Sequence, residues 1–153
     1  MPHTLDDIDK SILRALQDDA AGTVAEVAAR AGVSQTPCWK RIKKLEERGF
    51  IKKRVALLDA EQLGLALVGF IRIRTNAHNQ EWLDRFSKGV KLIPEVLECH
   101  RMTGDVDYLV KVALRDMADY DRVYKKLISL ADMADVSASF SMERLKETSA
   151  LPI

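Results

Sequence analysis

The residues best suited to bind a polyanion are concentrated in one short stretch, residues 34–54. It contains eight Lys or Arg residues against Glu46 and Glu47, a local net charge of +6, whereas the whole chain of 153 residues carries +1. A charge asymmetry of this kind indicates a polyanionic partner such as nucleic acid. The alternative is a basic helix face that is merely solvated.

The elements around this stretch predict a helix-turn-helix. Thr23 and Glu26 have the spacing of a capping box that opens a first helix, and Gly32 can take the left-handed conformation that ends it. Ser34 can then cap a second helix that runs to about Arg48. Together with the basic residues that follow, this order favours DNA binding over a solvated lysine face.

The second helix has an apolar face and a basic face. On a helical wheel Cys38, Ile42 and Leu45 fall on one side and the lysines on the other. We therefore expect it to enter the major groove of double-stranded DNA. The predicted DNA-binding residues are Gln35, Thr36, Trp39, Lys40, Arg41, Lys43, Lys44, Lys52, Lys53 and Arg54. Trp39 and Arg41 lie nearer the apolar face, so core packing and an ion pair with an acidic neighbour remain alternatives for them.

A second group of residues suits a free amino acid, which carries an ammonium and a carboxylate. Asp105 or Asp107 can bind the ammonium, and the backbone amides around Gly104 can bind the carboxylate. Alternatively, Gly104 and Asp105 simply form the turn of a hairpin. The predicted effector-binding residues are Thr103, Gly104, Asp105, Asp107, Tyr108, Ser137 and Ser139.

The pattern after residue 67 predicts a ferredoxin-like sandwich. Its strands are expected at 67–75, 96–103, 108–115 and 136–142, and its helices at 79–93 and 117–131. The resulting βαββαβ order places two helices on one face of a four-stranded antiparallel sheet. The other face is mixed in character, and we expect a second copy of the chain to cover it.

The predicted fold class is therefore α+β, with a winged helix-turn-helix ahead of the sandwich. A further helix capped by Thr4 completes the DNA-binding domain, and 50–58 is expected to be a wing or linking strand. The predicted domains are 4–54 for DNA binding, 55–66 as linker strand and turn, and 67–153 for effector binding and oligomerisation.

Other classes of function fit less well. His3, His78 and His100 lack metal-ligand spacing, and no nucleophile follows a strained turn, so we expect no enzyme, metal site or cofactor. Two distant cysteines and no long apolar run predict a cytoplasmic protein outside the membrane.

Several segments together resemble the Lrp/AsnC, or feast/famine, transcription regulators: LDDIDKSIL, GVSQTPCWKRIKKLEERGFIKK, VALLDAEQLGL and ECHRMTGDVDYLVKV. The tail MERLKETSALPI resembles a branch close to regulators of amino-acid and cysteine catabolism.

The resemblance implies a winged helix-turn-helix joined to a RAM/ACT-like effector domain. It also implies homodimers, often assembled into octamers as tetramers of dimers, and a free amino acid bound around the hairpin where dimers meet. The expected function is a sequence-specific transcription regulator whose assembly and DNA binding respond to that effector. The alternative is an architectural DNA-binding protein without an effector response.

Overall fold

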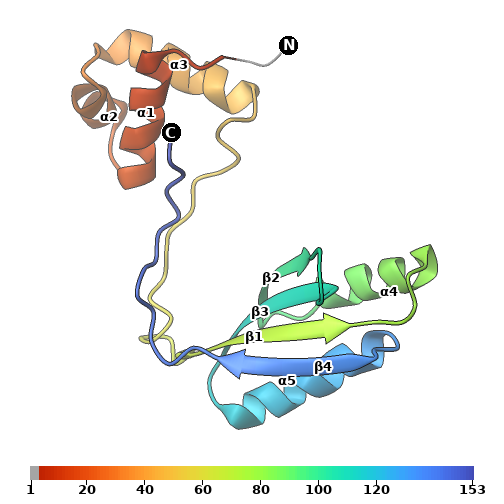
Figure 1. Cartoon of the computed structure of the whole chain (residues 1–153). Helices are drawn as coiled ribbons and strands as arrows, with labels where there is room; N and C mark the ends of the chain where they lie inside the picture. Colours follow the sequence, from red (N-terminus) through yellow and green to blue (C-terminus); the bar gives the residue numbers. More distant parts are fainter. Residues whose placement is uncertain (1–3) are drawn as a thin grey trace. The chain divides into compact units, whose positions relative to one another are not determined.

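The computed structural model describes residues 4–153, so His3 lies outside it. The chain forms two compact units (Figure 1). The first contains the residues up to Leu57 together with Lys146–Ile153, and the second contains Leu58–Leu145. The last eight residues were predicted to be part of the effector domain, and their contacts group them with the first unit.

The first unit is a bundle of three helices. These are α1 (Asp7–Asp18), α2 (Val24–Ala31) and α3 (Gln35–Glu47). Its buried core includes Ile12 from α1, Val27 from α2, and Ile42 with Leu45 from α3. The amphipathic spacing predicted for the helices is therefore confirmed, and it leaves the basic side of α3 on the surface.

The start of α1 differs from the prediction. Asp6, and not Thr4, is the N-cap: its side chain accepts a hydrogen bond of 2.7 Å from the Asp9 amide. The carboxylate is also favoured there by the partial positive charge of the helix N-terminus.

The segment that follows α3 has no strand. Residues 50–58 are irregular, so the expected wing or linking strand is wrong for this chain. The reason is that a strand needs a hydrogen-bonded partner, and no other strand pairs with this segment in the described residues. The turn expected within 55–66 is present: the Leu63 amide donates to the Asp59 carbonyl at 3.2 Å, and the turn ends at Gly64, whose φ is 72°.

The second unit has the predicted order of elements. They are β1 (Leu67–Arg74), α4 (Gln80–Val90), β2 (Val96–Arg101), β3 (Tyr108–Leu114), α5 (Met117–Leu130) and β4 (Asp135–Phe140). The antiparallel sheet has the strand order β2-β3-β1-β4. Both helices pack on one face, where Ile71, Phe86, Val110 and Leu127 are fully buried. The predicted α+β sandwich is confirmed.

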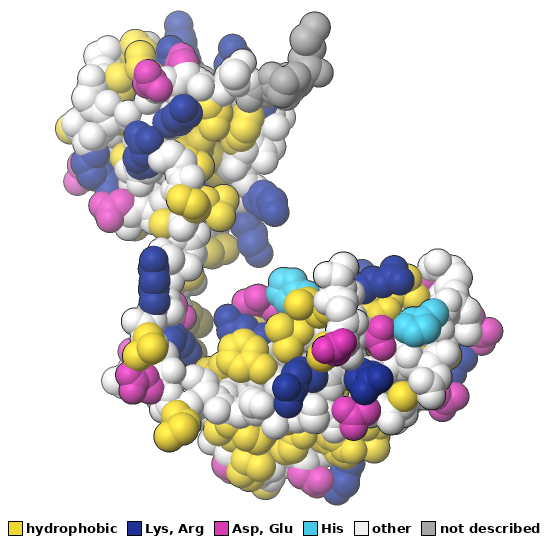
Figure 2. Space-filling view, in the orientation of Figure 1, with side chains coloured by type: hydrophobic (Ala, Val, Ile, Leu, Met, Phe, Trp, Pro, Cys, Tyr) yellow, Lys and Arg dark blue, Asp and Glu magenta, His cyan; other side chains and the backbone are white. Residues whose placement is uncertain are grey.

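The opposite face of the sheet has no helix over it, and we call it the open sheet face. Cross-strand pairing places Phe70 and Arg72 of β1 beside Lys111 and Leu109 of β3 on this face. Phe70 remains 38% exposed. The side of the second unit turned to the viewer in Figure 2 mixes hydrophobic, basic, acidic and histidine side chains. None of the helices described in residues 4–153 is long and apolar enough to cross a bilayer.

Candidate nucleic-acid interface and effector site

Local capping positions the basic helix. Thr23 and Glu26 form the predicted capping box: the Thr23 hydroxyl accepts from the Glu26 amide at 3.3 Å, and Glu26 accepts from the Thr23 amide at 2.6 Å. Gly32 has the left-handed φ of 70° that ends α2. Ser34 then stands at the predicted N-cap position of α3, although its side chain makes no capping hydrogen bond.

Nine of the ten predicted DNA-binding residues are exposed. Trp39 is 49% exposed and therefore does not belong to the buried core. The other exposed residues are Gln35, Thr36, Lys40, Lys43, Lys44, Lys52, Lys53 and Arg54. Glu46 partly neutralises this surface, because it pairs with Lys43 at 3.2 Å and with Arg54 at 3.1 Å. The remaining cations leave a strongly basic surface on the first unit, where Figure 2 shows many dark-blue side chains.

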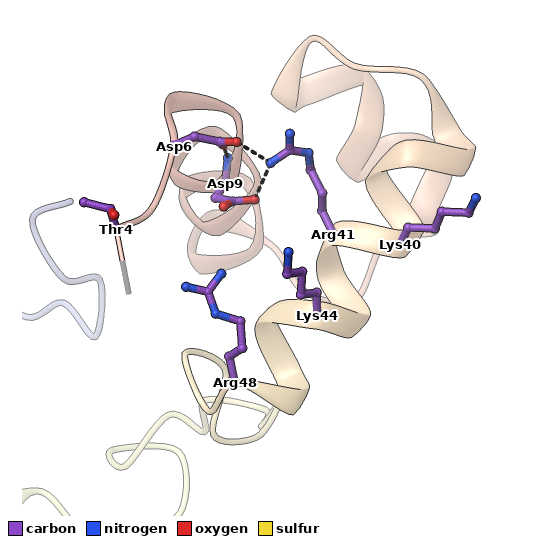
Figure 3. A pocket seen from close by; sticks show the side chains of 7 residues that line it. All are labelled: Thr4, Asp6, Asp9, Lys40, Arg41, Lys44 and Arg48. Carbon is purple, nitrogen blue, oxygen red and sulfur yellow. Dashed lines mark hydrogen bonds and ion pairs between the residues drawn. The ribbon is translucent and has the colours of Figure 1, made fainter. Parts of the chain in front are cut away.

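Arg41 is the exception, because it is engaged inside the unit. Its Nη1 lies 2.6 Å from Asp6 Oδ2 and 2.7 Å from Asp9 Oδ1 (Figure 3). The Asp9 carboxylate is largely buried, with its side chain 11% exposed. These two acceptors raise the pKa of Arg41, and the bonds from the Asp9 amide and from Arg41 lower the pKa of Asp6. The ion pair foreseen as the alternative for Arg41 is therefore present, and it ties α3 to α1.

A surface pocket of about 410 Å³ adjoins this ion pair. Lys44 and Arg48 point toward it, whereas Lys40 extends away from it (Figure 3). The Arg48 guanidinium carbon lies 4.9 Å from the centre of the Phe50 ring, and its Nε is buried without a hydrogen-bond partner. Arg48 belongs to the basic stretch but was not among the predicted DNA-binding residues. Its position at the last turn of an exposed basic helix was the available signal.

The predicted effector hairpin joins β2 to β3. Gly104 has a φ of 100°, a conformation that favours glycine, and it is exposed together with Thr103 and Asp105. The backbone bond from the Met102 amide to the Asp107 carbonyl, 2.8 Å long, closes the hairpin. The turn is thus open to solvent at the residues whose amides were predicted to bind a carboxylate.

Asp107 has a structural role, because it holds the hairpin to the end of β1. Its Oδ2 accepts a bond of 2.8 Å from the buried Thr75 amide, and its own amide donates to the Ile73 carbonyl at 3.0 Å. The Thr75 hydroxyl and the Trp82 indole both donate to the Asp132 carbonyl, at 3.3 and 2.6 Å. The end of β1, the hairpin and the segment after α5 are therefore held together, and Asp105 is the carboxylate left free of this network.

The structure does not bring all the predicted effector residues to one face. Tyr108 is buried on the helix-covered side, where its ring packs against Trp82 and Phe86 at centroid distances of 5.2 and 5.0 Å. Burial raises the pKa of its hydroxyl. Ser137 and Ser139 lie on the open sheet face, opposite Arg72 and Phe70. Only the backbone of Tyr108 remains available beside the turn.

Two stretches of the chain match known families of domains. Residues 5–52 match the winged helix-turn-helix DNA-binding family, and residues 68–151 match the Lrp/AsnC ligand binding domain. Both matches agree with the division of labour expected from the sequence.

Relatives match over almost the whole chain. The glutamate uptake regulatory protein of Zymomonas mobilis is 48% identical over 153 residues, which cover 100% of this chain and 93% of that protein. The DNA-binding transcriptional activator DecR of Escherichia coli is 45% identical over 150 residues, 97% of this chain and 99% of that one.

Solved structures agree with these relatives. An AsnC family transcriptional regulator from Agrobacterium tumefaciens superposes with a TM-score of 0.93 at 49% identity, covering 97% of each chain. A transcriptional regulator from Neisseria meningitidis, solved as its L-Met complex, gives a TM-score of 0.92 at 35% identity over 97% of each chain. The resemblance noted in the sequence is confirmed, and the chain belongs to the Lrp/AsnC family of DNA-binding transcription regulators.

Proposed function

We propose that the exposed basic side of α3 binds the major groove of duplex DNA in a sequence-specific manner. The observation that carries this proposal is the separation of cations in the first unit. Arg41 is engaged by Asp6 and Asp9, whereas Lys40 and Lys44 are exposed. Lys43 is exposed as well and pairs with the neighbouring Glu46 at 3.2 Å. The internal ion pair fixes the helix, and the outer side chains remain available for DNA.

The outer residues divide into two roles. Gln35, Thr36, Trp39 and Lys40 lie in the N-terminal half of α3, the part of a recognition helix that contacts base edges. Lys43, Lys44, Lys52, Lys53 and Arg54 come later and are proposed to contact phosphates, which position the protein without reading sequence. We also propose a cytoplasmic location, because the DNA-binding relatives are bacterial proteins.

For the second unit we propose a free amino acid as effector. The exposed Asp105 carboxylate would accept hydrogen bonds from the ligand's ammonium, and the amides around Gly104 would donate to the ligand's carboxylate. Asp107 would hold the hairpin through Thr75. Support comes from the match to a ligand-binding domain and from the neisserial relative, which was solved with L-Met.

The open sheet face is the proposed contact with a second copy of the chain. It combines Phe70 with polar and charged residues, including Lys111, which is paired with Glu98 at 2.8 Å. We propose homodimers that assemble further into a tetramer of dimers, with the effector bound where dimers meet. A ligand at such a contact would have different affinities for different assemblies and would shift their populations.

Selection from a random pool of duplexes tests the DNA function. The protein should enrich a common sequence and bind it at least about a thousandfold more tightly than unrelated duplex. Binding without sequence preference would instead favour the architectural alternative. Lack of binding to any duplex in dilute salt would contradict the proposal altogether.

Thermal unfolding with each of the twenty amino acids tests the effector function. L-methionine, cysteine and the aliphatic amino acids should be tried first, and an effector at a hundred times its Kd should stabilise by about 2.7 kcal/mol. Asp105→Ala should abolish the shift, whereas Glu61→Ala, an exposed carboxylate elsewhere in the second unit, should preserve it. Light scattering should show a change of assembly with the same ligand, and a ligand that leaves assembly and DNA affinity unchanged would refute the mechanism.

A further inference from the structure

The last residues of the chain contact α1 through backbone atoms. Gln17 binds Leu151 in both directions: its Nε2 donates to the Leu151 carbonyl at 3.1 Å, and its Oε1 accepts from the Leu151 amide at 2.6 Å. Arg14 Nε donates to the Ile153 carbonyl at 2.7 Å. Arg14 and Gln17 are three residues apart and therefore share one face of α1. Figure 1 shows the C-terminus beside this helix.

The contact lies along a groove of about 840 Å³ in the first unit. Leu13 and Leu16 of α1 line it together with Phe50 and the segment that follows α3. Ser149, Leu151 and Ile153 of the tail line the groove as well. The tail is held loosely, since Leu151 is 70% and Ile153 38% exposed. Exposed hydrogen bonds contribute little stability each, so a tail held in this way can dock and release.

The tail also has a special position in the chain. The chain passes from the first unit to the second after Leu57, and it returns after Leu145. The element before this return is β4, which carries Ser137 and Ser139, two residues that the sequence predicted to bind the effector. The first connection between the units is the linker that leads to β1. A docked tail adds a second connection, which starts from β4.

We infer that the Arg14–Gln17 face of α1 is a docking site for this chain's own tail, residues 146–153. Docking is reversible and, while it lasts, forms a second connection between the two units in addition to the linker. The functional part of this inference rests on the proposed function. With two connections, the linker and the docked tail, the DNA-binding unit has fewer orientations than with the linker alone. In a dimer, the docked tail would therefore restrict the separation between the two recognition helices.

Distances between spin labels test the docking in the full chain. Labels are attached at Ala21→Cys and Ser149→Cys, two positions that line the same groove, in a Cys99→Ser background; Cys38 is buried. A single short, narrow distance distribution is expected. A broad distribution would overturn the docking site.

Substitutions on α1 supply the matched comparison. The double variant Arg14→Ala and Gln17→Ala should broaden the distribution, whereas Lys10→Ala on the same helix should leave it narrow. Mixing labelled protein with a large excess of unlabelled protein should preserve the short distance. Its loss on mixing would assign the docked tail to a second copy and overturn the inference that the tail is the chain's own.

DNA binding tests the functional consequence. On a two-half-site duplex selected by the unmodified protein, two extra central base pairs should weaken its binding about tenfold or more, and that of the double variant less than about threefold. Equal losses of affinity for the two proteins, with the tail of the double variant released, would show that docking does not restrict the DNA-binding unit. If the unmodified protein binds no duplex, the proposed function and the restricting role of the tail both fail, while the label distances still decide whether the tail docks on α1.

Discussion

The two units differ in the groups that remain available to bind their proposed partners, DNA and an amino acid. In the first, Asp9 pairs with Arg41 while Lys40 and Lys44 are exposed on the surface. In the second, Asp107 engages the Thr75 amide, and what remains is the short side chain of Asp105 and the backbone of a turn. The proposed DNA interface therefore consists mainly of side chains on one helix, whereas the proposed effector site depends on the joint placement of separate segments.

This difference explains why the units should respond differently to substitution. A lysine on the outside of a helix can be removed without disturbing the core. A turn whose amides bind a ligand loses its geometry when the group that holds it is removed. Internal and outer residues of each unit therefore make matched pairs of variants.

The largest expected effect is that of Arg41→Ala. The nearly buried Asp9 carboxylate would lose its partner, which should lower the free energy of unfolding of the first unit by about 2 kcal/mol, allowing for solvent screening at the exposed Asp6 side. Lys40→Ala should leave stability within about 0.5 kcal/mol of the unmodified protein and weaken DNA binding. Hydrogen exchange in increasing urea, followed on peptides of each unit, measures both stabilities. A stable Arg41→Ala variant with DNA binding as weak as that of Lys40→Ala would make Arg41 a DNA contact.

Asp107→Ala should have the next largest effect, now in the second unit. It leaves the buried Thr75 amide without an acceptor, at a cost of about 1–2 kcal/mol. Asp105→Ala should leave stability unchanged, since no structural contact is lost. The same exchange measurement on peptides of β1 and β3 separates the two variants. Equal destabilisation by both substitutions would remove the distinction between the holding carboxylate and the free one.

A smaller effect concerns acid. Hydrogen bonds from Arg122 and Arg115, at 2.6 and 3.2 Å, lower the pKa of Asp119 well below its usual range. A carboxyl with a lowered folded-state pKa contributes full stability above its unfolded pKa of about 4, and that contribution is lost as the pH falls toward the folded-state pKa.

Asp119→Asn should therefore destabilise the second unit near neutral pH and make its stability less dependent on pH between about pH 5 and pH 2. In the first unit, where Asp6 and Glu26 have lowered pKa values, the acid dependence should be unchanged. Urea titrations at a series of pH values give this comparison. An unchanged acid response of the second unit would show that Asp119 does not dominate it.

The sequence predicted those parts of the molecule that depend on local chemistry. The Thr23 capping box, the left-handed Gly32 and the strand β1 lie within single segments, and all were predicted correctly. The strand expected at 50–58 was wrong because a strand exists only with a partner. Asp6, and not Thr4, is the cap because α1 begins at Asp7 and the Asp6 side chain accepts from the Asp9 amide; Asp6 also pairs with Arg41 of another helix.

The contacts that distinguish the site residues join distant parts of the chain. Asp107 meets Thr75 across 32 residues, and Gln17 meets Leu151 across 134. No periodicity or local motif encodes such a pair. The sequence therefore predicted the hairpin as a candidate site, but not which of its two aspartates holds the fold or where the tail docks.

The most direct test of the DNA interface is the salt dependence of binding to the selected duplex. For the unmodified protein and the variants Lys43→Ala and Lys88→Ala, the logarithm of the binding constant is plotted against the logarithm of salt concentration. Lys43→Ala should flatten the slope by about one unit without changing the preferred sequence, and Lys88→Ala, an exposed lysine of α4, should reproduce the unmodified slope. Identical slopes for all three proteins, or a changed sequence preference with Lys43→Ala, would contradict the proposed role of the outer face of α3.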